Sequence, residues 1–180
     1  MSRFLLPVAL FGVSVAALIS DPAHAEGFDG PYVGVQAGIA VLHIEGDILT
    51  GPFEETSETA FGSAVLGYRM SAGPLVLGAE GDIGIHVDGG DARYGVYGIA
   101  GARLGGSSLV YGRVGYAWHD GFADDLGKGL VLGGGFETKL AGPVNARIDY
   151  KYLDLGETDI PDNSFDITGH EVTAGIVFTF

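Results

Sequence analysis

A two-residue alternation of apolar and polar side chains recurs through the sequence and continues to the last residue. Between Glu171 and Phe180, one face carries only apolar residues: Val172, Ala174, Ile176, Phe178 and Phe180. This period is that of a β-strand. A final strand that stops on an aromatic residue has no later strand to pair with, so its edge needs a distant partner. The first strand of the mature chain is the natural candidate, and this pairing predicts a closed sheet.

Eight such segments follow one another along the chain. They span residues 32–41, 60–69, 75–86, 94–104, 110–119, 130–140, 144–152 and 171–180. Short turns rich in Gly, Pro and Ser (71–74, 105–108, 141–143) alternate with longer, acidic connections (43–59, 88–91, 120–128, 154–168). Short turns on one side and long loops on the other are typical of bacterial outer-membrane barrels. The predicted fold is therefore all-β: a closed eight-stranded antiparallel up-and-down transmembrane β-barrel.

The charge and hydropathy of the chain fit a membrane wall better than a soluble globule. The net charge is −14, yet the mean hydropathy is +0.30. After the leader, no apolar run reaches the 18 or so residues that a transmembrane helix needs. The sequence has no cysteine, which excludes disulfides and thiolate metal sites. The acidic balance argues against a nucleic-acid partner, because phosphates require a basic surface.

The N-terminus has the features of a secretory leader. Arg3 precedes an apolar core from Phe4 to Ile19, and Ala23-His24-Ala25 has the small-x-small pattern of a cleavage site. We predict that residues 1–25 are a signal peptide and that residues 26–180 form the outer-membrane barrel domain. A membrane-anchoring helix is the alternative, and Pro7 and the short core argue against it.

Aromatic residues gather at both ends of the apolar face, where a membrane-spanning wall meets the lipid headgroups. The predicted interface residues are Tyr68, Tyr94, Tyr116, Trp118, Tyr150 and Tyr152. Phe136, in the middle of its strand, departs from this pattern.

The opposite face carries charges of both signs in balance, although the whole chain is strongly acidic. We predict an ionic network inside the barrel, formed by Glu80, Asp82, Arg103, Arg113, Glu137, Lys139, Arg147, Asp149, Lys151 and Glu171. A narrow lumen needs this balance because an unpaired buried charge costs several kcal/mol. A soluble, lipocalin-like barrel with the faces inverted is the remaining fold alternative.

Five short motifs resemble, in their order along the chain, the small outer-membrane β-barrel family of Gram-negative bacteria, which includes OmpA/OmpX-like, opacity-type and porin-family surface proteins. They are Gly30-Pro-Tyr-Val-Gly34, Gly78-Ala-Glu-Gly-Asp82, Gly101-Ala-Arg-Leu-Gly105, Asp149-Tyr-Lys-Tyr-Leu-Asp-Leu-Gly156 and Phe178-Thr-Phe180. The resemblance implies that Phe178 and Phe180 are the signal read by the outer-membrane assembly machinery. The chain has Gly101-x-Arg103 where the family has Arg-x-Arg, and its second strand lacks the family's inward glutamine.

We expect no catalytic, cofactor or metal site. His86 and His119 have inward parity whereas His43 and His170 have outward parity, so no single site collects the four histidines. Ser107, Ser108 and Ser164 lie in turns or loops away from a base, which disfavours a hydrolase.

Two functions remain open from the sequence. The first is a structural and surface-interaction role in the outer membrane, with acidic external loops that meet host or envelope partners. Outer-membrane lipid and lipopolysaccharide are further expected partners. The second is a narrow, porin-like channel for small solutes or ions.

Overall fold

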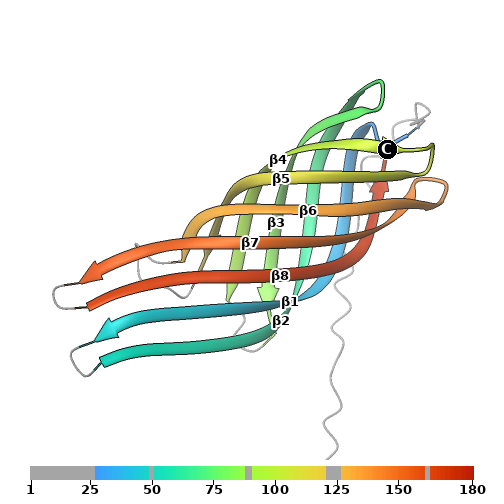
Figure 1. The fold of residues 1–180 in the computed structure, drawn as a ribbon. Coiled ribbons are helices and arrows are strands. Elements are labelled where there is room, and N and C mark those ends of the chain that lie inside the picture. The colour runs from blue at the N-terminus through green and yellow to red at the C-terminus, as the bar shows by residue number, and fades with distance from the viewer. Residues whose placement is uncertain (1–26, 49–50, 88–90, 121–126, 161–162) are drawn as a thin grey trace, which may run out of the picture.

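A computed structural model describes residues 27–48, 51–87, 91–120, 127–160 and 163–180. It contains eight strands: β1 (Gly30–Ile48), β2 (Gly51–Ala72), β3 (Leu75–His86), β4 (Ala92–Leu104), β5 (Ser108–His119), β6 (Lys128–Ala141), β7 (Val144–Ile160) and β8 (Asn163–Thr179). Each strand pairs antiparallel with its neighbours in the chain, and β8 pairs with β1 (Figure 1). The closed eight-stranded barrel predicted from the alternation is confirmed. The predicted leader, residues 1–25, lies outside the described residues.

The last strand closes the barrel against the first. The β1–β8 register runs from Tyr32 opposite Thr179 to Asp47 opposite Ser164. Beyond it, the Phe180 N–H donates a hydrogen bond to the Pro31 carbonyl oxygen at 2.9 Å. The C-terminus therefore lies at the end of the barrel that carries the short turns (Figure 1). No helix among the described residues is long and apolar enough to cross a membrane.

The two faces of the wall differ as the alternation predicts. Apolar side chains such as Leu77, Val114 and Ile176 are exposed on the outside, and charged side chains are buried inside. In the second strand, Ala64, Leu66 and Tyr68 face outward. An apolar exterior around a polar interior is the arrangement that lipid requires of a barrel.

The three short turns depend on glycine. Gly73, Gly105 and Gly142 have φ angles of 64°, 64° and 54°, in the left-handed region that other residues rarely adopt. They allow β2–β3, β4–β5 and β6–β7 to reverse direction within two or three residues.

Glycines on the inner face are needed for packing, whereas several on the outer face are not. A Cβ atom at Gly115 would collide with the Val96 carbonyl oxygen and the Tyr97 ring. A Cβ atom at Gly98, on the outer face, would meet nothing nearer than the Val114 carbonyl oxygen at 3.9 Å. The inner glycines thus make room for large side chains from neighbouring strands.

We expect Gly115→Val to destabilise the barrel by about 1–3 kcal/mol, as over-packing of a filled interior does. The matched change Gly98→Val should alter the free energy of unfolding by less than about 0.5 kcal/mol. Urea unfolding of both variants in lipid vesicles measures the difference. Equal losses at the two positions would mean that the inner wall is not packed as described.

Two connections predicted as loops are strand instead. Residues 43–59 and 154–168 were expected to be irregular, but β1 pairs with β2 up to Ile48 opposite Gly51, and β7 pairs with β8 up to Ile160 opposite Asn163. Because β1 and β8 also remain paired to Asp47 and Ser164, the four strands form one continuous sheet beyond the barrel (Figure 1). We call residues 42–48, 51–60, 154–160 and 163–169 the external sheet. At the paired positions Glu45 and Glu54, exposed acidic residues stand where the barrel wall has outward apolar ones.

Candidate functional site

The lumen contains two clusters of ion-paired side chains. The turn-side ion cluster consists of Arg69, Arg113, Arg147, Glu80, Glu137 and Asp149, all buried. Arg147 lies at its centre, 2.5 Å from Glu80 and 3.0 Å from Glu137. Arg69 contacts Glu137 at 2.9 Å, and Arg113 bridges Glu80 and Asp149 at 2.9 and 2.6 Å. Three positive and three negative groups therefore neutralise one another.

The loop-side ion cluster lies closer to the long loops and contains Arg93, Lys151, Asp82 and Glu171. Lys151 Nζ is 2.8 Å from Asp82 and 3.2 Å from Glu171. Arg93 is 2.8 Å from Asp82 and also pairs with Glu171. Two charges of each sign again cancel, so each cluster is neutral by itself.

Neutral polar side chains complete both clusters. Tyr32 donates a hydrogen bond to Glu80 at 2.7 Å, Gln36 donates to Asp149 at 2.6 Å, and Tyr111 donates to Asp149. Tyr97 donates to Asp82 at 3.3 Å, and the Arg69 guanidinium lies 4.1 Å from the centre of the Tyr32 ring. Because hydrogen bonds and π faces complement the charges, the buried ions have several of the contacts that a dry site demands.

Buried apolar clusters lie on both sides of the ionic residues along the lumen. On the turn side, Phe28 is fully buried with Val76, Ile99, Leu109 and Tyr111, and we call these five residues the turn-side plug. On the loop side the buried apolar cluster comprises Tyr97, Ala117, Val131, Leu153, Leu155 and Ile167, with Leu42 and Ile44 packed against it. The ionic interior is thus enclosed between two apolar layers.

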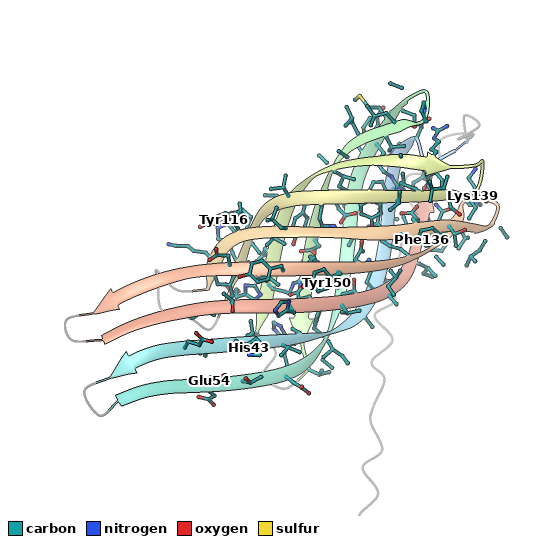
Figure 2. The ribbon with its side chains drawn as sticks, viewed as in Figure 1. His43, Glu54, Tyr116, Phe136, Lys139 and Tyr150 are labelled. Atoms are coloured by element: carbon teal, nitrogen blue, oxygen red, sulfur yellow. The ribbon has the colours of Figure 1, made fainter. Side chains whose placement is uncertain are left out.

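Eight of the ten residues predicted to line the interior lie in the two ion clusters, and two do not. Arg103 is partly exposed at the turn-side rim, where it pairs with Asp29 at 2.6 Å. Lys139 lies 5.9 Å from the centre of the Phe28 ring, near the short turns (Figure 2). Their strands end at these positions, so both side chains reach the rim and water rather than the ionic interior.

Sequence reasoning missed Arg69 and Arg93, which supply two of the five buried cations. Both have inward parity: Arg69 follows the outward Tyr68, and Arg93 precedes the outward Tyr94. Arg69 is the last residue of the predicted segment 60–69, so applying parity to it would have found it, and extending the segment 94–104 back by one residue would have found Arg93.

The aromatic residues predicted for the interface lie on the outer wall. Tyr68, Tyr94, Tyr116, Trp118 and Tyr150 are exposed there, and Tyr152 is partly covered. The ring centres of Tyr116 and Trp118 lie 5.1 Å apart. Figure 2 shows Tyr116 and Tyr150 nearer the loop side than Phe136. Phe178 and Phe180, which the family resemblance links to assembly, are exposed at the turn side.

The histidines form two pairs rather than one site. His43 and His170 lie on the outer wall with ring centres 6.0 Å apart, and His86 and His119 lie at the inner mouth with ring centres 6.1 Å apart. Among the described residues, no group of three or more His, Cys, Asp or Glu side chains is arranged to hold a metal ion.

The chain is similar to several solved structures. The Neisserial surface protein A structure matches with a TM-score of 0.50 and 16% identity, covering 84% of this chain and 100% of that one. The attachment invasion locus protein Ail of Yersinia pestis, solved with the heparin analogue sucrose octasulfate, matches with a TM-score of 0.46 and 14% identity, covering 83% and 99%. A de novo designed transmembrane β-barrel matches with a TM-score of 0.46 and 12% identity, covering 79% and 95%. No curated protein sequence matches the chain.

The family assignment rests on a sequence model rather than on these distant folds. Residues 4–180 match the family described as outer membrane protein beta-barrel domain, and this match covers nearly the whole chain. The chain therefore belongs to the outer-membrane β-barrel protein family and resides in the bacterial outer membrane.

Proposed function

We propose that this barrel is a non-enzymatic surface protein whose external sheet binds a positively charged partner outside the cell. The observation that carries the proposal is the composition of that sheet. The external sheet includes nine acidic residues and no Lys or Arg. Such a surface attracts cationic partners and repels anionic ones.

The register of the external sheet supports a cationic partner. Glu157 pairs with Asp166, Asp166 with Glu45, and Glu45 with Glu54, so acidic residues occupy one row across β7, β8, β1 and β2. Like charges directly opposite one another destabilise a sheet. A partner that supplied positive charge along this row would relieve that repulsion. Figure 2 shows Glu54 on the extension beyond the barrel, away from the interface tyrosines.

The external sheet also packs against the apolar interior of the barrel. Leu42 and Ile44, at the start of the extension, pack on the loop-side apolar cluster with Leu155 and Ile167. A rigid base reduces the conformational entropy that binding would otherwise cost. The candidate partners are host proteins, envelope proteins and divalent cations. Such cations would bridge the external sheet to lipopolysaccharide. Outer-membrane lipid would surround the wall, and the assembly machinery would read the C-terminal Phe178 and Phe180.

Neutralising the external sheet tests this proposal. We expect the combined change of Glu45, Glu54, Glu55 and Glu58 to glutamine to weaken binding of poly-lysine to the barrel in nanodiscs several-fold, because the partner loses its electrostatic complement. A matched control changes Asp88, Asp120, Asp124 and Asp125, in other connections, to asparagine and removes the same charge. Equal weakening by both sets, or by neither, would contradict a role for the external sheet.

The narrow-channel alternative rests on the charged residues along the lumen. Against it stand the buried, neutral ion clusters in the lumen and the apolar clusters on either side of them. We therefore expect no stepwise conductance from the barrel in planar bilayers. Conductance steps that change when Arg113 or Glu80 is neutralised would establish the channel instead.

A further inference from the structure

His86 and His119 face one another at the loop-side mouth of the barrel. His86 ends β3 and His119 ends β5, with β4 between them. Their ring centres are 6.1 Å apart and the ring planes differ by 24°. Phe61 packs edge-on against His86 with ring centres 5.8 Å apart, which holds that imidazole in place.

The same backbone arrangement fixes both imidazoles. The backbone N–H of His86 donates to the Asp91 carbonyl oxygen at 3.1 Å, and its Nδ1 lies 3.3 Å from the same oxygen. His119 makes the same two contacts with the Gly127 carbonyl oxygen. Its backbone N–H donates to that oxygen at 2.8 Å, and its Nδ1 lies 3.3 Å from it. A carbonyl oxygen only accepts hydrogen bonds, so Nδ1 must carry the proton. Each neutral ring therefore has an unprotonated Nε2.

Two oriented imidazoles with bare Nε2 atoms have the chemistry of a transition-metal site. Histidine ligands in proteins usually donate their other ring N–H to a carbonyl or carboxylate, which sets the tautomer and the ring orientation. With metal–nitrogen bonds of about 2 Å, each ring centre lies about 3 Å from the metal, so two ligands have centres up to about 6 Å apart. The observed separation of 6.1 Å is at this limit, and the two rings are stacked nearly parallel, so metal binding requires both imidazoles to turn until their Nε2 atoms point at the ion.

The electrostatic surroundings suit a cation. Arg93 lies directly opposite His119 in the β4–β5 register, but its charge is neutralised by Asp82 and Glu171. The two connections next to the histidines, residues 87–91 and 120–127, contain five aspartates and no Lys or Arg. The sequence next to the two histidines therefore carries an excess of negative charge, which attracts a divalent cation.

We infer that His86 and His119 form an open, two-imidazole site for a borderline transition-metal ion such as Cu²⁺, Zn²⁺ or Ni²⁺, with water completing the coordination. This ligand set prefers such metals to Ca²⁺ or Mg²⁺, which favour oxygen ligands. The outer pair, His43 and His170, is less well defined. Their Nδ1 atoms bond the hydroxyl groups of Thr56 and Tyr150, which can donate or accept, so their tautomers are not fixed.

Copper titration of the full, untagged barrel in detergent micelles tests the inference. We expect one Cu²⁺ per chain, with an electron paramagnetic resonance spectrum that shows coupling to two nitrogen atoms. His86→Gln and His119→Gln should each reduce the affinity at least about tenfold. The matched double variant His43→Gln/His170→Gln should bind as the wild type does. Unchanged binding in His86→Gln/His119→Gln, or loss of binding only in the outer-pair variant, would overturn the assignment.

A second measurement does not depend on variants that fold. In the wild-type barrel, Cu²⁺ should broaden the imidazole ¹⁵N resonances of His86 and His119 before those of His43 and His170. Broadening of the outer pair first, or of all four together, would also overturn the site.

Discussion

Replacing Arg147 with methionine is expected to lower the free energy of unfolding of the barrel by about 3–5 kcal/mol, the usual cost of removing one partner from a buried ion pair. Arg147 is almost completely buried and lies between Glu80 and Glu137. Without it, the turn-side ion cluster has three carboxylates and only two cations. Methionine fills much of the same volume but cannot compensate that charge. Urea unfolding in lipid vesicles, followed through the fluorescence of the single tryptophan, Trp118, measures the loss.

Two further variants separate charge imbalance from lost packing. Arg103→Met removes a similar side chain from a partly exposed pair at the rim, where a salt bridge contributes about 0–1 kcal/mol. Adding Glu137→Gln to Arg147→Met restores the neutrality of the cluster and should recover part of the stability. If Arg103→Met costs as much as Arg147→Met, or if the double variant is no more stable than the single one, the charge-balance explanation fails.

The substitution Val114→Arg is expected to destabilise the barrel by about 2–4 kcal/mol, because it places a charge in hydrocarbon near the bilayer midplane. Val114 is exposed on the outer face in the middle of β5, between residues 108 and 119. The loss should depend on lipid and be smaller in a detergent micelle, whose boundary is thinner and wetter. Unfolding in vesicles of two acyl-chain lengths measures it.

The control for Val114→Arg is the same substitution on the external sheet. Thr56 is exposed on β2 beyond the interface aromatic residues, and Thr56→Arg should cost less than about 1 kcal/mol. Equal effects at the two positions would mean that the outer wall does not face lipid, and the inverted, lipocalin-like arrangement would then have to be reconsidered.

The barrel could be predicted from sequence because lipid imposes a strict pattern on its wall. A residue such as Leu77 must face hydrocarbon and its neighbour Gly78 must face inward, so parity alone assigns both sides. The pairing of β8 with β1 was predicted because the edge of the last strand needs a partner. These inferences needed no knowledge of individual contacts.

The external sheet escaped prediction for the same reason. Beyond the membrane, Glu45 and Glu54 occupy the outward positions that Val35 and Ile39 occupy within it. A strand exposed to water on that face no longer has an apolar row, so its hydropathy resembles that of a loop. Its hydrogen-bonded partners on adjacent strands, not its own side chains, keep it extended.

The contacts within the lumen could not be predicted from the sequence either. Parity placed His86 and His119 inside, but it could not show that they meet across β4. Arg147 was assigned to the interior, yet its central position between Glu80 and Glu137 depends on the stagger of β3, β6 and β7. That stagger is set by the closure of the whole barrel.

The enclosure of the ion clusters between two apolar layers means that ionic strength acts on only one part of this molecule. Dissolved salt shortens the reach of charges to about 8 Å under physiological conditions, but only where the ions can penetrate. The acidic row outside the membrane will therefore be sensitive to the medium, with its self-repulsion falling as salt rises. The interior pairs will keep their strength from fresh water to brine. A bacterium that moves between such environments would thus alter what this surface attracts without loosening the cylinder that carries it.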